Sequence, residues 1–454
     1  MRIERRYIAA ANDGSIRGMA SARTAVLLAL SLFGCKREVK PETQAAVTAP
    51  VPAAAGDAGT GGTTDRGPTW YRAVVRAPDG VEVPFFLGVP APGAPGQAVF
   101  KVGGHEVRSG ATFDGKILKV PLAVHQTAVE ATLGKDGIFR GSFSTSWRAW
   151  GASSIPLTAA KVAAPTANTL ATVASDAAVL DQGAPRTVWR LAMHDSGVAK
   201  LVVNQTAPGD FDGLLLLDTG NIIYMAGNGR GDAVVLSGFD GTAGYRLELV
   251  LGADRTSARG QYFGGHRLDW RETLTATRGA DFVLALKPKA TRPGAKIEFP
   301  DHPELAALGH GPLVVEIAGS WCSTCRNAAP FLVELYREYQ QRGLTMVTLL
   351  YEFSDDRVVD AKQAETFKKA YGVTWPVIPV SGGMDSFSEI MPSGLADLNP
   401  GGFPLTLFLA PDRSLIALHA GFPASDAADE FRRVAAEFRA NIETLLASPI
   451  DSHR

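Results

Sequence analysis

The stretch that decides the fold of this 454-residue chain is residues 312–343, PLVVEIAGSWCSTCRNAAPFLVELYREYQQRG. Its first part is an apolar run of the kind found in strands that are buried on both faces of a parallel sheet. The part after the cysteines has apolar side chains at helical spacing and stops at Gly343, a residue type that often ends helices. The stretch therefore predicts a strand and a helix joined by a short turn that carries Cys322 and Cys325.

Strand and helix patterns alternate on the C-terminal side of this turn. Strands are expected at 344–352, 375–380, 404–410 and 414–422, and helices at 360–372 and 425–447. A strand, a crossover helix, a second strand, then a hairpin and a closing helix form an α/β domain. We expect that domain over residues 290–448.

The region 69–285 has a different texture, with short β-type runs between turn signals and no lasting helical period. This pattern predicts an all-β sandwich or barrel. WYRAVVRAPDG from Trp70 is echoed by WRLAMHDSG from Trp189, 119 residues later, and TLGKDGIFRGSF is echoed by VLGADRTSARGQYF at nearly the same offset. Two related β units, 69–160 and 185–285, are therefore one expectation, and chance similarity between hairpins is the other.

The N-terminus predicts export. Residues 1–35 combine a basic start with the short apolar run TAVLLALSLFGC, which is too short to span a membrane and resembles a lipoprotein signal that ends at Cys35. Residues 36–68 are rich in Ala, Pro, Gly and Thr and predict a disordered linker. The expected location is the bacterial cell envelope, facing the periplasm, with a lipid on Cys35 as the only membrane attachment and with Met1 or Met19 as the start.

Composition narrows the chemistry of the cysteine pair. The 45 basic and 46 acidic side chains nearly cancel, so no nucleic-acid partner is expected. Three cysteines cannot build a disulfide scaffold, and one CxxC supplies only half of a zinc site, so neither a metal nor another cofactor is expected. A redox pair remains. Cys322 would lie at the helix N-terminus, where the helix dipole stabilises a thiolate, and Cys325 would lie one turn into the helix.

These motifs resemble the TlpA/ResA-like disulfide reductases of the thioredoxin fold, some of which carry a β-rich N-terminal domain. Glu316 lies six residues before Cys322, Pro330 lies five after Cys325, and GGFPLTLFL matches the family's cis-proline stretch at Pro404. The resemblance implies that Cys322 attacks, Cys325 resolves, Glu316 relays a proton, Trp321 flanks the site, and Phe403 and Pro404 form the substrate groove. The chain departs from the family at Ser323–Thr324, where a proline is usual, and at Ala328, where an acid is usual.

The expected function is an extracytoplasmic thiol-disulfide oxidoreductase that reduces exposed protein disulfides. By family analogy, the partners would be protein substrates, including apocytochrome c, and an integral membrane thiol electron donor. A thiol peroxidase is an alternative, although IAGSWCSTC lacks the expected PxxxTxxC pattern. A non-catalytic binding protein that uses its β-rich region is the other. Glu352, at the end of the next strand, is a candidate second polar group near the site, and His419 is expected to be structural.

Overall fold

The computed structural model describes residues 67–93, 95–146, 153–166, 170, 185–286, 294–299, 302–354, 356–381 and 402–447. The signal segment with Cys35, nearly all of the linker, and most of the Gly-rich stretch before Pro404 lie outside these ranges. The residues from Gly56 onward belong to one compact unit.

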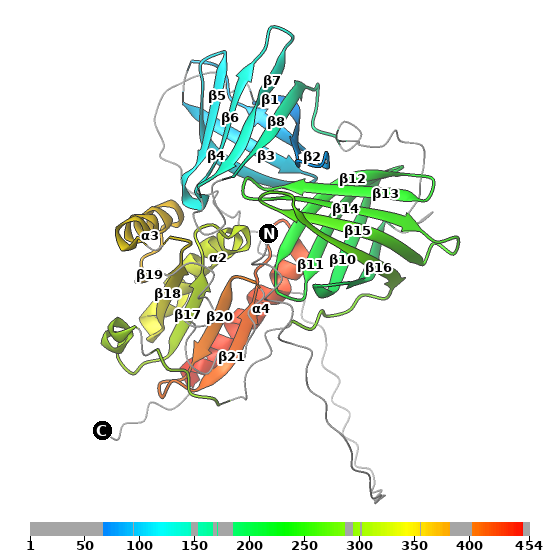
Figure 1. The fold of residues 1–454 in the computed structure, drawn as a ribbon. Helices are drawn as coiled ribbons and strands as arrows, with labels where there is room; N and C mark the ends of the chain where they lie inside the picture. The colour runs from blue at the N-terminus through cyan, green and yellow to red at the C-terminus, as the bar shows by residue number, and fades with distance from the viewer. Residues whose placement is uncertain are drawn as a thin grey trace, which may run out of the picture. The chain divides into compact units, whose positions relative to one another are not determined.

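The first β unit is a closed antiparallel barrel in which each strand pairs with the next and β8 returns to β1 (Figure 1). Apolar and polar residues alternate along most of its strands, so that one face fills the interior and the other meets solvent. The strands are β1 (Thr69–Arg76), β2 (Glu82–Val89), β3 (Gly96–Val102), β4 (His105–Phe113), β5 (Ile117–Leu122), β6 (Thr127–Leu133), β7 (Ile138–Thr145) and β8 (Ser153–Lys161).

The second β unit repeats this design, with β16 closing onto β9. Its strands are β9 (Arg186–Met193), β10 (Gly197–Ala207), β11 (Asp210–Leu217), β12 (Ile222–Arg230), β13 (Ala233–Phe239), β14 (Gly244–Leu251), β15 (Ser257–Gly265) and β16 (Trp270–Gly279). The predicted β-rich fold class is confirmed, and the architecture is two barrels.

The sequence echoes fall at equivalent places in the two barrels. Trp70 lies in the first strand of one barrel and Trp189 in the first strand of the other. The second echo is the β6–β7 hairpin in one barrel and the β14–β15 hairpin in the other. Within these hairpins, a Cβ on Gly141 or on Gly260 would lie 1.9 Å from a backbone carbonyl oxygen of the paired strand. The same steric constraint at matching positions supports an internal duplication.

Aromatic side chains fill the first barrel, and one of them comes from the second. Phe239, in β13, is 2% exposed and belongs to the hydrophobic core of the first barrel. Its ring lies 4.3 Å from that of Phe85 and 5.0 Å from that of Phe143, measured between centroids. The two barrels therefore share part of one core.

The C-terminal region is a five-stranded sheet in the order β19-β18-β17-β20-β21. Its central strands β17 (Leu313–Ala318) and β18 (Thr345–Tyr351) are parallel, as are β18 and β19 (Val377–Val380), whereas β20 (Leu405–Leu409) and β21 (Leu415–Ala420) run antiparallel. This is the expected α/β order, and it is the thioredoxin-like arrangement.

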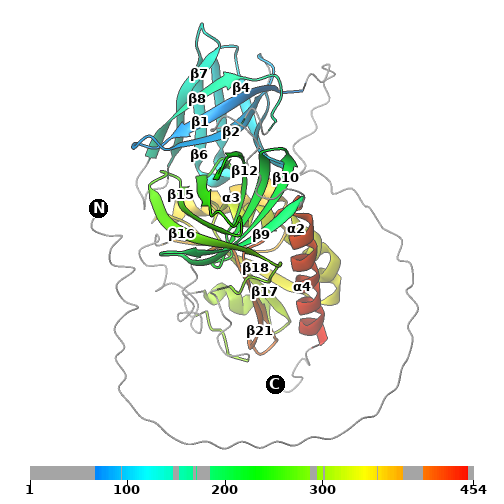
Figure 2. The same cartoon turned by 90° about the vertical axis from the view of Figure 1, so that its right-hand side faces the viewer.

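Within the described part of this domain, three α-helices accompany the sheet: α2 (Ser323–Tyr339), α3 (Arg357–Tyr371) and α4 (Ala428–Ala447). Helices α2 and α4 lie side by side in Figures 1 and 2. The Phe331 ring of α2 contacts the Phe431 and Phe438 rings of α4. Helix α2 contains Pro330, and a 3₁₀ turn extends it to Gly343, whose φ of 93° is left-handed, as the sequence predicted.

We predict that Phe239→Ala will lower the free energy of unfolding by about 3–5 kcal/mol, because it removes a buried aromatic side chain and leaves a cavity between the barrels. Thermal and denaturant unfolding of the full chain measure the change. Val358→Ala is the control, since Val358 is 80% exposed. A loss no larger than the control's would show that the shared core does not contribute to stability.

Candidate redox site

The site begins at the turn between β17 and α2. Strand β17 is buried along its whole length, so its register and the turn that follows it are fixed by the core. Cys322 is the N-cap of α2, and its Sγ accepts a hydrogen bond of 3.0 Å from the backbone N–H of Cys325. The two cysteines form a disulfide, with Cα atoms 5.3 Å apart. Cys322 is 6% exposed and Cys325 is fully buried.

The turn before β20 lies against this disulfide. The Phe403–Pro404 peptide bond is cis, and the carbonyl oxygen of Phe403 lies 3.6 Å from Sγ of Cys322. The Pro404 carbonyl accepts a hydrogen bond from the N–H of Gly421, which ties the turn to the end of β21. The structure therefore brings the residues named for the substrate groove next to the residue named as the nucleophile.

Trp321, next to Cys322 in the chain, is held by one hydrogen bond and two aromatic contacts. Its indole N–H donates to the carbonyl oxygen of Tyr351 at 2.9 Å. Its ring lies 4.4 Å from the Phe353 ring and 5.1 Å from the Phe403 ring. The indole thus links the ends of β17 and β18 to the cis-proline turn.

Glu316 is a fully buried carboxyl on β17. Its Oε2 accepts a hydrogen bond of 2.7 Å from the hydroxyl of Thr348, whose oxygen in turn accepts from the Trp375 indole. Oε1 is buried without a hydrogen-bond partner among the described residues. Burial raises the pKa of Glu316 to about 7, against a smaller lowering by Thr348. A carboxyl with this pKa can accept or give a proton at neutral pH.

A second buried carboxyl, Glu352, lies just after β18. Its oxygens accept hydrogen bonds from the Ser320 backbone N–H at 3.2 Å and from the Ser320 hydroxyl at 2.9 Å, two residues before Cys322. Burial raises the pKa of Glu352 to about 8. Gln126, from the first barrel, donates to the same carboxylate at 3.1 Å. The structure thus joins Glu352 to the active-site turn.

Sequence reasoning missed the supporting residues Ser320, Thr348, Trp375 and Gln126. Nothing near Gln126 in the sequence distinguishes it, because its role depends on a contact 226 residues away. Ala328, where the chain departs from the family pattern, is buried in α2. His419, expected to be structural, pairs with Glu437 at 3.0 Å.

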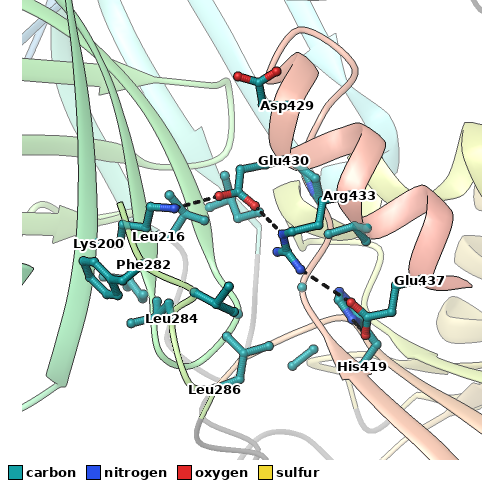
Figure 3. Close-up of a pocket in the computed structure, with 18 of the residues that line it drawn as sticks. Lys200, Leu216, Phe282, Leu284, Leu286, His419, Asp429, Glu430, Arg433 and Glu437 are labelled. Atoms are coloured by element: carbon teal, nitrogen blue, oxygen red, sulfur yellow. Dashed lines mark hydrogen bonds and ion pairs between the residues drawn. The ribbon is translucent and has the colours of Figure 1, made fainter. Parts of the chain in front are cut away.

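A separate hollow of about 690 Å³ lies between β10, residues 281–286 and α4 (Figure 3). Its charged groups satisfy one another: Lys200 donates to Glu430, and Arg433 pairs with Glu430 and Glu437. Leu216, Leu284 and Leu286 form apolar parts of its wall. Neither cysteine lines this hollow, so it is distinct from the redox site.

The described ranges contain no group of three or more His, Cys, Asp or Glu side chains placed to hold a metal ion. No helix in the same ranges is both long and apolar enough to cross a membrane.

The fold and the site define a thioredoxin-like domain with a CxxC disulfide at a helix N-terminus. No family model matches the chain. Over 119 residues, 26% of this chain and 58% of the relative, it is 24% identical to the thiol-disulfide oxidoreductase ResA of Bacillus subtilis (strain 168). It is 30% identical over 90 residues to ResA of Bacillus thuringiensis subsp. konkukian (strain 97-27), which covers 20% of this chain and 45% of that one.

The chain therefore spans about half the length of the curated relatives it matches. The solved structures that resemble this chain include a thiol:disulfide interchange protein of the thioredoxin family from Chlorobium tepidum TLS. It is 18% identical, with a TM-score of 0.24, and the match covers 31% of this chain and 84% of that one. Another is a DsbF homologue from Corynebacterium diphtheriae, at 20% identity and a TM-score of 0.23, and the match covers 31% of this chain and 76% of that one. The sequence-based resemblance to ResA-like proteins is confirmed for about a quarter of the chain.

The raised pKa of Glu316 predicts a pH-dependent stability. Because the folded state holds this proton more tightly than the unfolded state, the stabilisation is full below pH 4.5 and is lost as pH rises to about 7. We expect the oxidised wild-type chain to lose about 3 kcal/mol more than Glu316→Gln over this window. Unfolding free energies measured from pH 4 to 8 test this.

Glu365→Gln is the control, because Glu365 is exposed on α3. Glu352 titrates in both chains and cancels in the comparison. Parallel pH profiles of the wild type and Glu316→Gln would contradict the assigned ionisation.

Proposed function

We propose that this protein is a thiol-disulfide oxidoreductase that reduces disulfides in other proteins. The observation that carries the proposal is the Cys322–Cys325 disulfide at the N-terminus of α2, in contact with the Phe403–Pro404 turn. The similarity to ResA over the same region supports it. The working unit is the domain over 290–448, preceded by a β-rich region over 69–285.

The reduced pair acts in two exchanges. The Cys322 thiolate, stabilised by the N–H of Cys325 and the dipole of α2, attacks one sulfur of a substrate disulfide. The substrate S–S bond breaks, and its other sulfur leaves as a thiolate that takes a proton. Cys325 then attacks Sγ of Cys322, the mixed disulfide breaks, and the second substrate sulfur leaves. The substrate has gained two electrons, and the pair has become a disulfide.

Glu316 serves as the proton acceptor for Cys325. Its pKa of about 7 leaves a fraction of the carboxyl ionised at neutral pH, and burial places it in the same interior as the resolving thiol. Trp321 and Phe403 hold the groove, and the backbone of Phe403 presents its polar groups to an extended substrate segment.

A dithiol electron donor must return the disulfide to the reduced state, because each turnover consumes the pair's two electrons. An integral membrane thiol protein fits an exported chain, and apocytochrome c is one candidate substrate by analogy with the family.

A thiol peroxidase lacks support, because no peroxidase-type PxxxTxxC stretch surrounds Cys322. A binding protein that uses its barrels remains an alternative, and loss of exchange activity in the full chain would favour it.

We predict that Cys325→Ser will trap substrate proteins as mixed disulfides on Cys322, whereas Cys322→Ser will trap none. Only the Cys322 thiolate is stabilised by the N-terminus of α2, and without Cys325 no thiol of the pair is left to resolve the mixed disulfide. Non-reducing gels and mass spectrometry after incubation with an oxidised protein such as insulin measure trapping. Equal trapping by both variants would overturn the assigned order, and unchanged insulin reduction by both would rule out the enzyme.

We also propose that the chain is exported and anchored by a lipid on Cys35. The support is the apolar run that ends at Gly34–Cys35 and the Pro- and Gly-rich linker behind it. Cys35→Ser should move the protein from the membrane to the soluble fraction and abolish labelling with a fatty-acid analogue. A wild-type chain that fractionates as soluble and retains residues 1–34 would refute the anchor.

A further inference from the structure

Connections from both barrels reach the active-site segment of the thioredoxin-like domain. The 3₁₀ turn η3 (Ala123–His125) of the first barrel accepts hydrogen bonds from Gln363 of α3 through two of its carbonyl oxygens. The β11–β12 turn of the second barrel approaches the cis-proline turn so closely that a Cβ on Gly402 would lie 2.6 Å from the carbonyl oxygen of Thr219. The barrels thus abut the redox site directly.

The β13–β14 turn of the second barrel contacts Arg326, the residue that follows the second cysteine. Arg326 directly follows Cys325, and its backbone N–H donates to the Cys322 carbonyl at 3.2 Å. Its guanidinium donates to the backbone carbonyl of Asp240 at 3.1 Å and lies 3.7 Å from the Asp240 carboxylate. The exposed fractions of these side chains are 14% and 16%, so water screens the pair only weakly.

This pair carries opposite charges at neutral pH. Arginine stays protonated in proteins. Burial favours the neutral form of Asp240, but Arg326 and the hydrogen bonds from Thr242 and Ala243 outweigh it and lower the pKa of this carboxyl. The turn that these bonds build holds the carboxylate in place.

The other titratable groups here are mostly neutral. His125 lies 3.5 Å from the Arg326 guanidinium, and burial together with that charge lowers its pKa to about 3. Burial raises the pKa of Tyr224, Tyr245 and Tyr371, so their hydroxyls stay protonated. Glu316 and Glu352 titrate near and above neutrality. Farther out, Asp426 pairs with His105.

Ser323, which lies between the two cysteines, also faces the second barrel. Ser323 and Arg326 line one small crevice together with Asp240 and with Tyr245, which lies in β14. The second barrel therefore lies against residues on both sides of Cys325 in the sequence.

We propose that Asp240 is a positioning residue through which the second barrel sets the reactivity of the Cys322–Cys325 pair, by neutralising and orienting Arg326. Arg326 carries its positive charge on the residue that directly follows Cys325. A nearby cation favours the thiolate of Cys322 and so the reduced state, and the Asp240 carboxylate opposes that effect. The β-rich region then forms part of the redox site. This inference rests on the proposed function for its biological meaning, although the thiol chemistry can be measured without it.

Asp240→Asn tests the proposal in the full-length reduced chain. Asparagine keeps an oxygen for the turn but removes the charge, so the unopposed Arg326 should lower the pKa of Cys322 by roughly 0.5–1 unit. The pH profile of iodoacetamide alkylation, read by mass spectrometry on the Cys322 peptide, gives this pKa. The reduction potential should rise with it, because the reduced form is stabilised. Arg326→Gln should shift both quantities the other way, and Asp240→Glu should restore wild-type values.

Asp254→Asn is the matched control. Asp254 lies in the β14–β15 turn of the same barrel and accepts similar hydrogen bonds from Thr256 and Ser257, and its hydrogen-bond partners among the described residues belong to this turn. This variant should leave both quantities unchanged. An Asp240→Asn profile that matches the control, or that moves upward, would overturn the proposal. If insulin reduction is absent while the predicted shift appears, the proposed function fails and this inference stands.

Discussion

The hydrogen bond from the backbone N–H of Cys325 to the sulfur of Cys322 is the interaction on which the rest of the site depends. It exists because β17 ends where α2 begins, so that a side chain at the N-cap meets unpaired N–H groups of the first turn. Those N–H groups stabilise negative charge on the sulfur, and a thiolate is the form that attacks disulfides. The carbonyl oxygen of Phe403 in the cis-proline turn lies 3.6 Å from this sulfur, and the adjacent Trp321 is held by a hydrogen bond to Tyr351.

The two buried carboxyls, Glu316 and Glu352, have different hydrogen-bond partners. Glu316 is fully buried on β17 and accepts a hydrogen bond from the Thr348 hydroxyl. Glu352 is tied to the turn itself through Ser320 and to the first barrel through Gln126. Burial raises the pKa of both, so each has a proton to exchange near neutrality. Under the proposed function, Glu316 would transfer the proton and Glu352 would hold the active-site turn.

The sequence predicted the α/β domain well, because the pattern of each element is local. An apolar run, a helical period and Gly343 at the helix end need no information from elsewhere in the chain. The barrels were harder, since their closure depends on the pairing of β1 with β8 and of β9 with β16, strands that lie far apart in sequence. The Trp70 and Trp189 echo nevertheless marked the first strand of each barrel. Phe239, Gln126 and Asp240 could not be predicted, because each matters only through contacts across domains.

Equilibration of the full-length protein with dithiothreitol or glutathione redox buffers shows whether the Cys322–Cys325 pair is redox-active in the folded state. Trp321 contacts the site, so its fluorescence, together with mass analysis of trapped thiols, can report the state of the Cys322–Cys325 pair. We expect one reversible two-electron transition in the native protein, at a potential in the range of known exchange proteins, roughly −120 to −300 mV. A disulfide that stays oxidised until the protein unfolds would contradict it, because the pair would then be a structural bridge.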